Sequence, residues 1–295
     1  MTQSPAPAGL VIVDKADEMT SHDVVARVRR ILGTRKVGHA GSLDPMATGV
    51  LVLGVGRATR LLGHLMLTEK AYDATVRFGV TTTTDDREGE VRTTATTSGL
   101  DDATVRAAFA EQVGALAQVP SAVSAIKVDG KRAYQRVRDG ETLELKPRPV
   151  TVHELVVHGL RPRGEHRDVD ISVRCSSGTY IRAIARDVGA ALGVGGHLVA
   201  LRRTAVGPFD LTAARTLDDL GTDRGDAVLA IAEAARAVFP TLDLDDAQAA
   251  DVRVGRRLAH DLGQDGPVAL FDPAGEFLAL YEQRGDSAVA TAVFV

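Results

Sequence analysis

The stretch Gly38-His-Ala-Gly-Ser-Leu-Asp-Pro-Met-Ala-Thr-Gly49 interrupts the regular apolar patterns on either side of it. It contains three glycines and a proline and follows neither the helical nor the strand period, which predicts a structured loop. Asp44 lies in this loop between Leu43 and Pro45. Reactive groups are often carried by such loops, but an Asp-Pro pair is also a common turn former. The loop is therefore a candidate active site, with a purely structural turn as the alternative.

Regular patterns flank the loop on both sides. Residues 9–14 are predicted to form a strand, residues 21–33 an amphipathic helix with Ser21 as its N-cap, and residues 50–55 and 71–78 two further strands. The remaining predicted elements are, in chain order, a helix at 103–116, a strand at 169–175, a helix at 181–192, a helix at 226–238, and strands at 267–271 and 277–281. This mixture predicts the α+β class, with a mixed, mainly antiparallel sheet and flanking helices.

Length and composition indicate a globular protein with two domains. A chain of 295 residues with 44% hydrophobic composition can bury one large core and a smaller one. The composition becomes acidic after Pro240, so a small β-rich domain is predicted from there to the end. Cys175 is the single cysteine, and residues 1–8 do not resemble a signal peptide. The apolar run at 50–55 is too short to span a membrane. We therefore expect a cytoplasmic protein.

The distribution of charge leaves room for a nucleic-acid partner. The net charge of −4 alone would argue against one, because phosphate binding usually needs a basic surface. However, residues 240–295 contain ten acidic and four basic side chains, so the first 239 residues carry a slight basic excess. Residues 15–70 and 124–151 are locally basic. We interpret 124–151 as a protruding element; a solvated charged face is the alternative for both segments.

Other chemistries find little support in the sequence. The eight histidines and the single cysteine show no spacing typical of metal ligands, so no metal site is predicted. Gly54-Val-Gly56 follows an apolar run, but Thr59 stands where a dinucleotide-binding loop has its third glycine. Tyr72 lies on the apolar face of its strand and fits an ordinary core aromatic. Arg182 lies in the first turn of its helix, where the helix dipole disfavours a positive charge, so by its position alone its side chain is interpreted as solvent-exposed.

Five segments, taken together and in this order, resemble the bacterial tRNA pseudouridine synthase B family. They are Gly9-Leu-Val-Ile-Val-Asp-Lys15, Gly38-His-Ala-Gly-Ser-Leu-Asp-Pro45, Lys70-Ala-Tyr72, Ser177-Gly-Thr-Tyr-Ile-Arg182 and Leu201-Arg-Arg203. The family isomerises uridine to pseudouridine at position 55 in the T-loop of tRNA, a reaction with no net redox change. The resemblance therefore implies a base-flipping isomerase of tRNA that needs no cofactor, with residues 1–239 as its catalytic domain.

The resemblance also implies roles for individual residues. Asp44 corresponds to the family's catalytic carboxylate, and an ion pair with Arg182 is expected to hold it ionised. The residues expected to bind the substrate are His39, Tyr72, Tyr180, Arg182 and Leu201. Those expected to clamp the RNA, within the basic stretch 124–151, are Lys127, Lys131 and Arg132.

Two segments depart from the family pattern. Val123 occupies a position where many members have tyrosine, and residues 240–295 are only loosely similar to the small RNA-binding domain called PUA. We expect a monomer that has no obligate protein partner and is not associated with a membrane. A non-catalytic tRNA-binding or folding factor is the alternative function, and a guide-RNA-dependent relative is a further possibility on the motifs alone.

Overall fold

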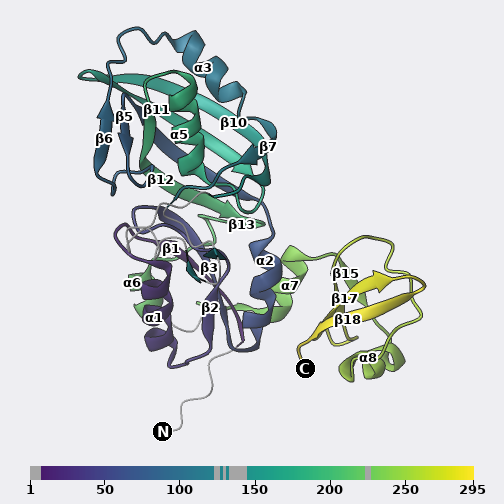
Figure 1. Ribbon diagram of the computed structural model, residues 1–295. Coiled ribbons are helices and arrows are strands. Elements are labelled where there is room, and N and C mark those ends of the chain that lie inside the picture. Colours follow the sequence, from purple (N-terminus) through teal and green to yellow (C-terminus); the bar gives the residue numbers. More distant parts are fainter. Residues whose placement is uncertain (1–7, 123–126, 129–130, 133–144, 223–226) are drawn as a thin grey trace.

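The computed structural model describes residues 8–122, 127–128, 131–132, 145–222 and 227–295. Figure 1 shows an elongated main domain and a smaller, β-rich C-terminal domain beside it. The main domain is built on a ten-stranded sheet and the C-terminal domain on a four-stranded one. The predicted α+β class is confirmed, with helices flanking a mainly antiparallel sheet.

The large sheet joins distant parts of the chain. Its strands are β1 (Gly9–Lys15), β2 (Val37–His39), β3 (Thr48–Val55), β4 (Lys70–Phe78), β7 (Gly114–Gln118), β10 (Arg148–Arg163), β11 (His166–Cys175), β12 (Gly196–Val206), β13 (Phe209–Asp210) and β14 (Leu229–Ala230). The order is β14-β1-β3-β12-β4-β11-β10-β7, with β2 paired to β3 and β13 to β12. Only β3 and β12 run parallel among these described neighbours. That pairing places the end of the candidate loop beside a strand formed 150 residues later.

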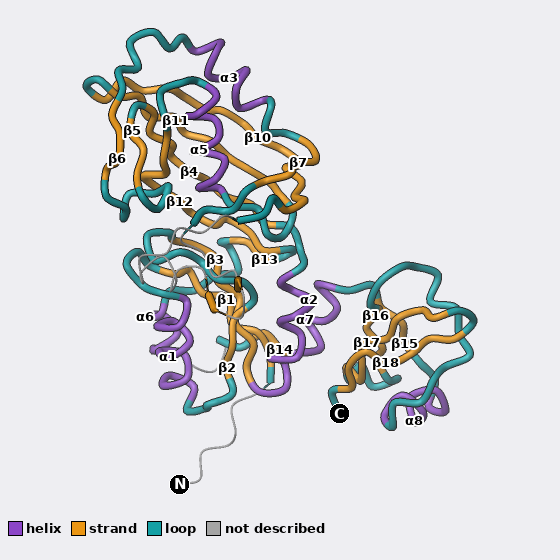
Figure 2. Tube along the Cα trace, in the orientation of Figure 1, coloured by secondary structure: helices purple, strands orange, loops and turns teal. Residues whose placement is uncertain are grey.

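Helices pack on both faces of the sheet, which are both apolar at β1 and β3. The helical segments are α1 (Ser21–Leu32), η1 (Gly56–Leu61), α2 (Leu62–Met66), α3 (Asp102–Ala110), α5 (Ile181–Ala191), α6 (Leu217–Thr222), α7 (Ile231–Val238) and α8 (Asp246–Arg253). Helix α5 lies across the sheet beside β12 and β4 (Figure 2). Its Ile184 and Val188, one turn apart, are buried in the same core as Val76 of β4. None of the helices described here is long and apolar enough to cross a membrane.

Small hairpins and the C-terminal sheet complete the described structure. The hairpins pair β5 (Val80–Thr82) with β6 (Val91–Thr94), and β8 (Lys127–Val128) with β9 (Lys131–Arg132). The C-terminal sheet contains β15 (Thr241–Asp243), β16 (Val268–Phe271), β17 (Phe277–Arg284) and β18 (Ser287–Val293). Phe271, Phe277 and Phe294 share a buried apolar cluster with Ile231 of α7, and Arg57 donates a hydrogen bond to the Phe294 carbonyl (2.7 Å). The small domain is therefore packed against the main domain.

Two local predictions were wrong. The helix predicted at 103–116 ends at Ala110, because the chain turns and residues 114–118 pair with β10 as β7. The N-cap of α1 is Thr20, which forms a capping box with Asp23. Ser21 is instead buried, and its hydroxyl accepts from the Leu43 N–H (2.9 Å) and donates to the Leu43 carbonyl (3.2 Å). The first residue of α1 therefore supports the candidate loop.

Gly49 permits the parallel contact between β3 and β12. Its φ is +99°, and a Cβ atom there would lie 2.2 Å from the carbonyl oxygen of Arg203. A side chain at this position requires the two strands to separate and the backbone to adopt a strained conformation.

We expect Gly49→Ala to lower the free energy of unfolding by about 3 kcal/mol or more, because strain and overpacking add. Gly63→Ala is the control. Gly63 lies in α2 with no atom within 4 Å of an added Cβ, so alanine should leave stability unchanged or raise it by up to about 1 kcal/mol. Urea unfolding of both variants measures this. A Gly49→Ala urea midpoint equal to that of the wild type would contradict the conclusion that the β3–β12 contact requires glycine at this position.

Candidate active site

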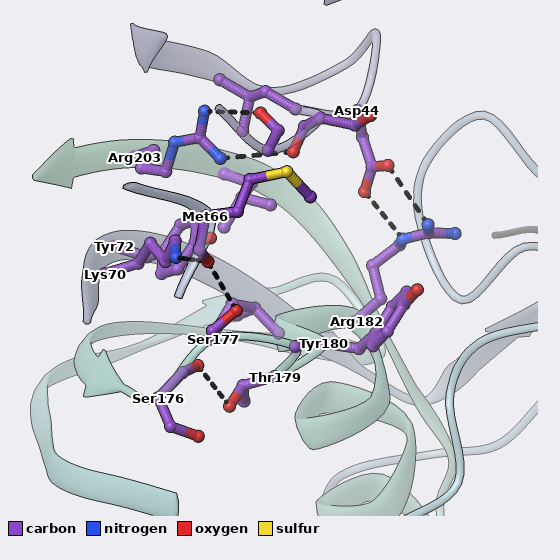
Figure 3. Close-up of a pocket in the computed structure, with 16 residues that line it drawn as sticks. Asp44, Met66, Lys70, Tyr72, Ser176, Ser177, Thr179, Tyr180, Arg182 and Arg203 are labelled. Carbon is purple, nitrogen blue, oxygen red and sulfur yellow. Dashed lines mark hydrogen bonds and ion pairs between the residues drawn. The ribbon is translucent and has the colours of Figure 1, made fainter. Parts of the chain in front are cut away.

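A cavity of 340 Å³ lies where the motif segments of the main domain meet (Figure 3). Its lining consists of loop residues 41–44, Met66, Lys70 and Tyr72 of β4, residues 176–182 before and within α5, and Leu201 and Arg203 of β12. The sheet order explains the convergence, because β12 lies between β3 and β4. The structure thus brings together Asp44, Tyr72, Tyr180, Arg182 and Leu201, five of the residues singled out from the sequence.

The predicted ion pair between Asp44 and Arg182 is present in this cavity. Arg182 Nε lies 2.9 Å from Asp44 Oδ2, and Nη2 donates to Oδ1 at 3.3 Å. Figure 3 shows the two contacts side by side. The Arg182 side chain is 5% exposed and that of Asp44 is 35% exposed. The guanidinium therefore fixes both carboxylate oxygens while Asp44 remains accessible from the cavity.

Arg182 is itself held by a second carboxylate. Its Nη1 donates to the Thr84 carbonyl (2.9 Å) and lies 3.3 Å from Asp86 Oδ2. Asp86 is buried and accepts hydrogen bonds from the Thr84 hydroxyl (2.5 Å) and the Glu88 N–H (3.0 Å). Asp86 could not be singled out from the sequence, because it lies in a polar turn without periodicity. The only signal was a pair of adjacent aspartates after four threonines.

Buried cations support the backbone of the candidate loop. Lys15 Nζ donates to the carbonyls of Pro45 (3.0 Å), Met19 (2.7 Å) and Ala16 (2.9 Å). Burial lowers the pKa of Lys15 to about 8, and the charge of Asp44 partly opposes this shift. The loop backbone next to Asp44 is thus fixed to the end of β1.

Arg203 supports the other side of the loop. Its guanidinium donates to the carbonyls of Gly41 (3.3 Å), Ser42 (3.2 Å) and Val50 (2.7 Å), and the residue is 2% exposed. These bonds connect β12 to the backbone on both sides of Asp44. Arg203 belongs to one of the motifs, but this role could not be predicted, because its partners are backbone carbonyls more than 150 residues away.

Tyr72 and Lys70 form the wall contributed by β4. Burial raises the pKa of the Tyr72 hydroxyl, so the hydroxyl stays protonated near neutral pH. Lys70 Nζ donates to the Met66 carbonyl (2.6 Å) and the Thr68 carbonyl, and burial lowers its pKa to about 8. The Ser177 hydroxyl also donates to the Met66 carbonyl (2.7 Å). The cavity rim at Met66 is therefore fixed from two sides.

Among the described side chains proposed for the site, that of His39 lies outside this cavity lining. His39 belongs to β2, and its ring packs edge-on against that of His22 with the centroids 5.6 Å apart. Lys127, Lys131 and Arg132 lie in the β8–β9 hairpin, where Lys127 pairs with Arg132 along the backbone. Their side chains are not described, and Val123 and most of the stretch 124–144 fall outside the described residues.

The cavity suits a small planar ring beside a reactive carboxylate. Its volume is within the usual range for small-ligand sites, about 300–1,000 Å³. An oriented, ionised carboxylate can act as a nucleophile or accept a proton, and the phenol ring offers a face for stacking. Within the described part of the chain, no group of three or more His, Cys, Asp or Glu side chains is arranged to hold a metal ion.

Family models match the chain over most of its length. Residues 29–181 match the N-terminal domain of TruB family pseudouridylate synthases. Residues 182–233 match a C-terminal domain of tRNA pseudouridylate synthase B, and residues 239–295 match the C-terminal domain of tRNA pseudouridine synthase II.

Named relatives and solved structures agree with these matches. The tRNA pseudouridine synthase B of Thermobifida fusca is 56% identical over 97% of this chain and 98% of its own length. That of Streptomyces griseus is 54% identical over 99% of both chains. A chain of an H/ACA ribonucleoprotein bound to a substrate RNA containing 2′-deoxyuridine matches 97% of this chain and 85% of its own, with 25% identity and a TM-score of 0.73. A chain of a Cbf5–Nop10–Gar1 complex matches 99% of this chain and 86% of its own, with 26% identity and a TM-score of 0.75. The chain therefore belongs to the TruB family of pseudouridylate synthases.

Proposed function

We propose that this pseudouridine synthase acts on tRNA, converts the uridine at position 55 of the T-loop, and uses Asp44 as its catalytic carboxylate. The observation that carries the proposal is the two-point ion pair between Asp44 and Arg182 at a cavity walled by Tyr72. The high identity to relatives named tRNA pseudouridine synthase B supports tRNA as the substrate.

The reaction requires a reactive group but no redox partner. The bond between the ribose and N1 of uracil breaks, the uracil turns, and C5 of the base bonds to the ribose while the C5 proton is lost and N1 gains one. Atoms and electrons balance within the nucleotide, so we propose no cofactor. Asp44 serves as a nucleophile or accepts the proton, and Arg182 orients both of its carboxylate oxygens.

The target base must leave its stack to reach Asp44. Extrusion costs a few kcal/mol, and stacking on an aromatic ring recovers part of that cost. We assign that ring to Tyr72 and the neighbouring walls to Tyr180 and Leu201, and the position of all three in the cavity lining supports this. His39 lies outside the cavity lining, so we assign it to RNA outside the flipped nucleotide.

The chain divides into two proposed domains and a proposed RNA clamp. We propose residues 1–239 as the catalytic domain and 240–295 as a PUA-like domain, with Lys127, Lys131 and Arg132 as a clamp on phosphates. We also propose a stand-alone cytoplasmic monomer, and the relatives named tRNA pseudouridine synthase B support its action on tRNA. The competing function, a non-catalytic tRNA-binding factor, would not require the Asp44–Arg182 pair, so that pair favours catalysis.

Incubation with unmodified tRNA, followed by mapping of pseudouridine, tests the proposed function. We expect pseudouridine at position 55 and at no other T-loop uridine, and no product when position 55 is cytidine. Tight binding of tRNA without pseudouridine formation would instead favour the binding-factor alternative. Product at another position would contradict the proposed site specificity.

Arg182→Lys should reduce turnover much more than tRNA binding, by about 100-fold or more, because lysine keeps the charge but cannot hold both oxygens of Asp44. Arg77→Lys is the matched control. Arg77 also contacts an aspartate, Asp168, at two points (2.7 and 2.8 Å), but it does not line the cavity. Single-turnover rates at saturating tRNA measure the difference. Equal losses in the two variants would show that the cavity pair has no special role.

Binding of tRNA should weaken as salt rises, although the protein is net acidic, because a few lysine or arginine contacts to phosphates release counterions. We expect the dissociation constant to rise about tenfold or more between roughly 50 and 200 mM salt. The double variant Lys127→Gln, Lys131→Gln should show a shallower salt dependence. An affinity that is flat in salt, or a slope that the double variant leaves unchanged, would contradict the clamp.

A further inference from the structure

Gln118 contacts the backbone of a cavity residue with both atoms of its amide. Its Nε2 donates to the Tyr180 carbonyl (3.1 Å), and its Oε1 accepts from the Tyr180 N–H (2.8 Å). The residue is the last of β7 and is 4% exposed. A buried amide with both groups satisfied by one residue fixes the position of that residue closely.

Tyr180 is the N-cap of α5, where a helix needs external support. Its side chain makes no capping hydrogen bond. Its carbonyl also accepts from the N–H groups of Ala183 (3.1 Å) and Ile184 (3.2 Å), so Gln118 holds the peptide from which the first turn begins. Arg182 belongs to that turn, two residues after Tyr180. A displacement of the N-cap therefore moves both the Tyr180 ring and the Arg182 guanidinium relative to Asp44.

The same end of β7 is attached to α5 a second time. Arg186, one turn after Arg182, donates from Nη2 to the Val119 carbonyl (2.7 Å). Gln118 also pairs with Arg148 at the start of β10. The chain therefore leaves the sheet at the end of β7 and re-enters it at the start of β10, and both points lie beside this attachment. The basic segment belongs to the stretch between them. The attachment fixes α5 to the edge of the sheet at the level of the cavity.

We propose that Gln118 is a positioning residue of the active site, which holds the Tyr180 backbone and thereby aims Tyr180 and Arg182 at Asp44. It does not line the cavity, so it acts through these two residues and not on the substrate. The inference rests on the proposed function, because its clearest readout is pseudouridine formation.

Gln118→Met tests this with a side chain of similar size that lacks both polar groups. We expect the single-turnover rate to fall about 10- to 100-fold, the effect of a misplacement of about 1 Å, while tRNA affinity changes less than about threefold. Gln248→Met is the matched control, because Gln248 also bonds to a helix N-cap, Asp245, but in the C-terminal domain. It should leave the rate unchanged. A Gln118→Met rate equal to that of the wild type would overturn the proposal.

Gln118→Glu separates positioning from a general loss of packing. A protonated glutamic acid can donate to the Tyr180 carbonyl and accept from its N–H, as the amide does, whereas the ionised form cannot donate. Burial raises the pKa of such a carboxyl group. The rate of this variant, divided by the wild-type rate at the same pH, should therefore rise several-fold from about pH 8 to about pH 6. A ratio of about one throughout this range, with Gln118→Met equally active, would show that the amide only fills space.

The wild-type assays distinguish a failure of the proposed function from a failure of the positioning role of Gln118. If the wild type forms no pseudouridine in tRNA, the proposed function fails. If the wild type is active and both Gln118 variants match it at every pH, the proposed function stands and the positioning role is wrong.

Discussion

The candidate active site depends on an ion pair between a buried guanidinium, Arg182, and a partly exposed carboxylate, Asp44. Such a pair stabilises the structure only if its geometry is good and the remaining hydrogen-bonding groups are satisfied, because removing charges from water is costly. Asp44 and Arg182 meet these conditions through their neighbours. Asp86 and the Thr84 carbonyl bind the other side of Arg182, and Lys15 anchors the backbone next to Asp44. Much of the polar structure around the cavity thus serves to hold one carboxylate in place.

The sheet order makes this arrangement possible. The loop with Asp44 leads into β3, whereas Arg182 begins a helix that packs on β12 and β4. The parallel contact of β3 with β12 brings these elements together, and Gly49 allows the close approach. Arg203 then uses β12 as a support for the loop. The fold and the proposed chemistry are therefore linked at one pair of parallel strands in the sheet, β3 and β12.

The sequence was most informative where local periodicity or a motif carries the signal. Alternation predicted the strands around 71–78 and 169–175, and the glycine-rich loop predicted an unusual position for Asp44. Periodicity could not reveal Asp86 or Gln118, because the contacts that connect them to the cavity residues span 62 or more positions. The same reason hid the function of Ser21, whose type suggests a helix cap but whose hydroxyl bonds to the Leu43 backbone. The helix predicted past Ala110 failed because pairing with β10 overrides local propensity.

Replacing Asp44 by asparagine tests the central claim most directly, because the volume is nearly unchanged and the negative charge is lost. Single-turnover conversion of unmodified tRNA and tRNA affinity should be measured on the same preparation. The account predicts no detectable pseudouridine from Asp44→Asn, with an affinity within about tenfold of the wild type, or about 1.4 kcal/mol. Conversion at a rate comparable with the wild type would contradict the assignment of Asp44 as the catalytic carboxylate.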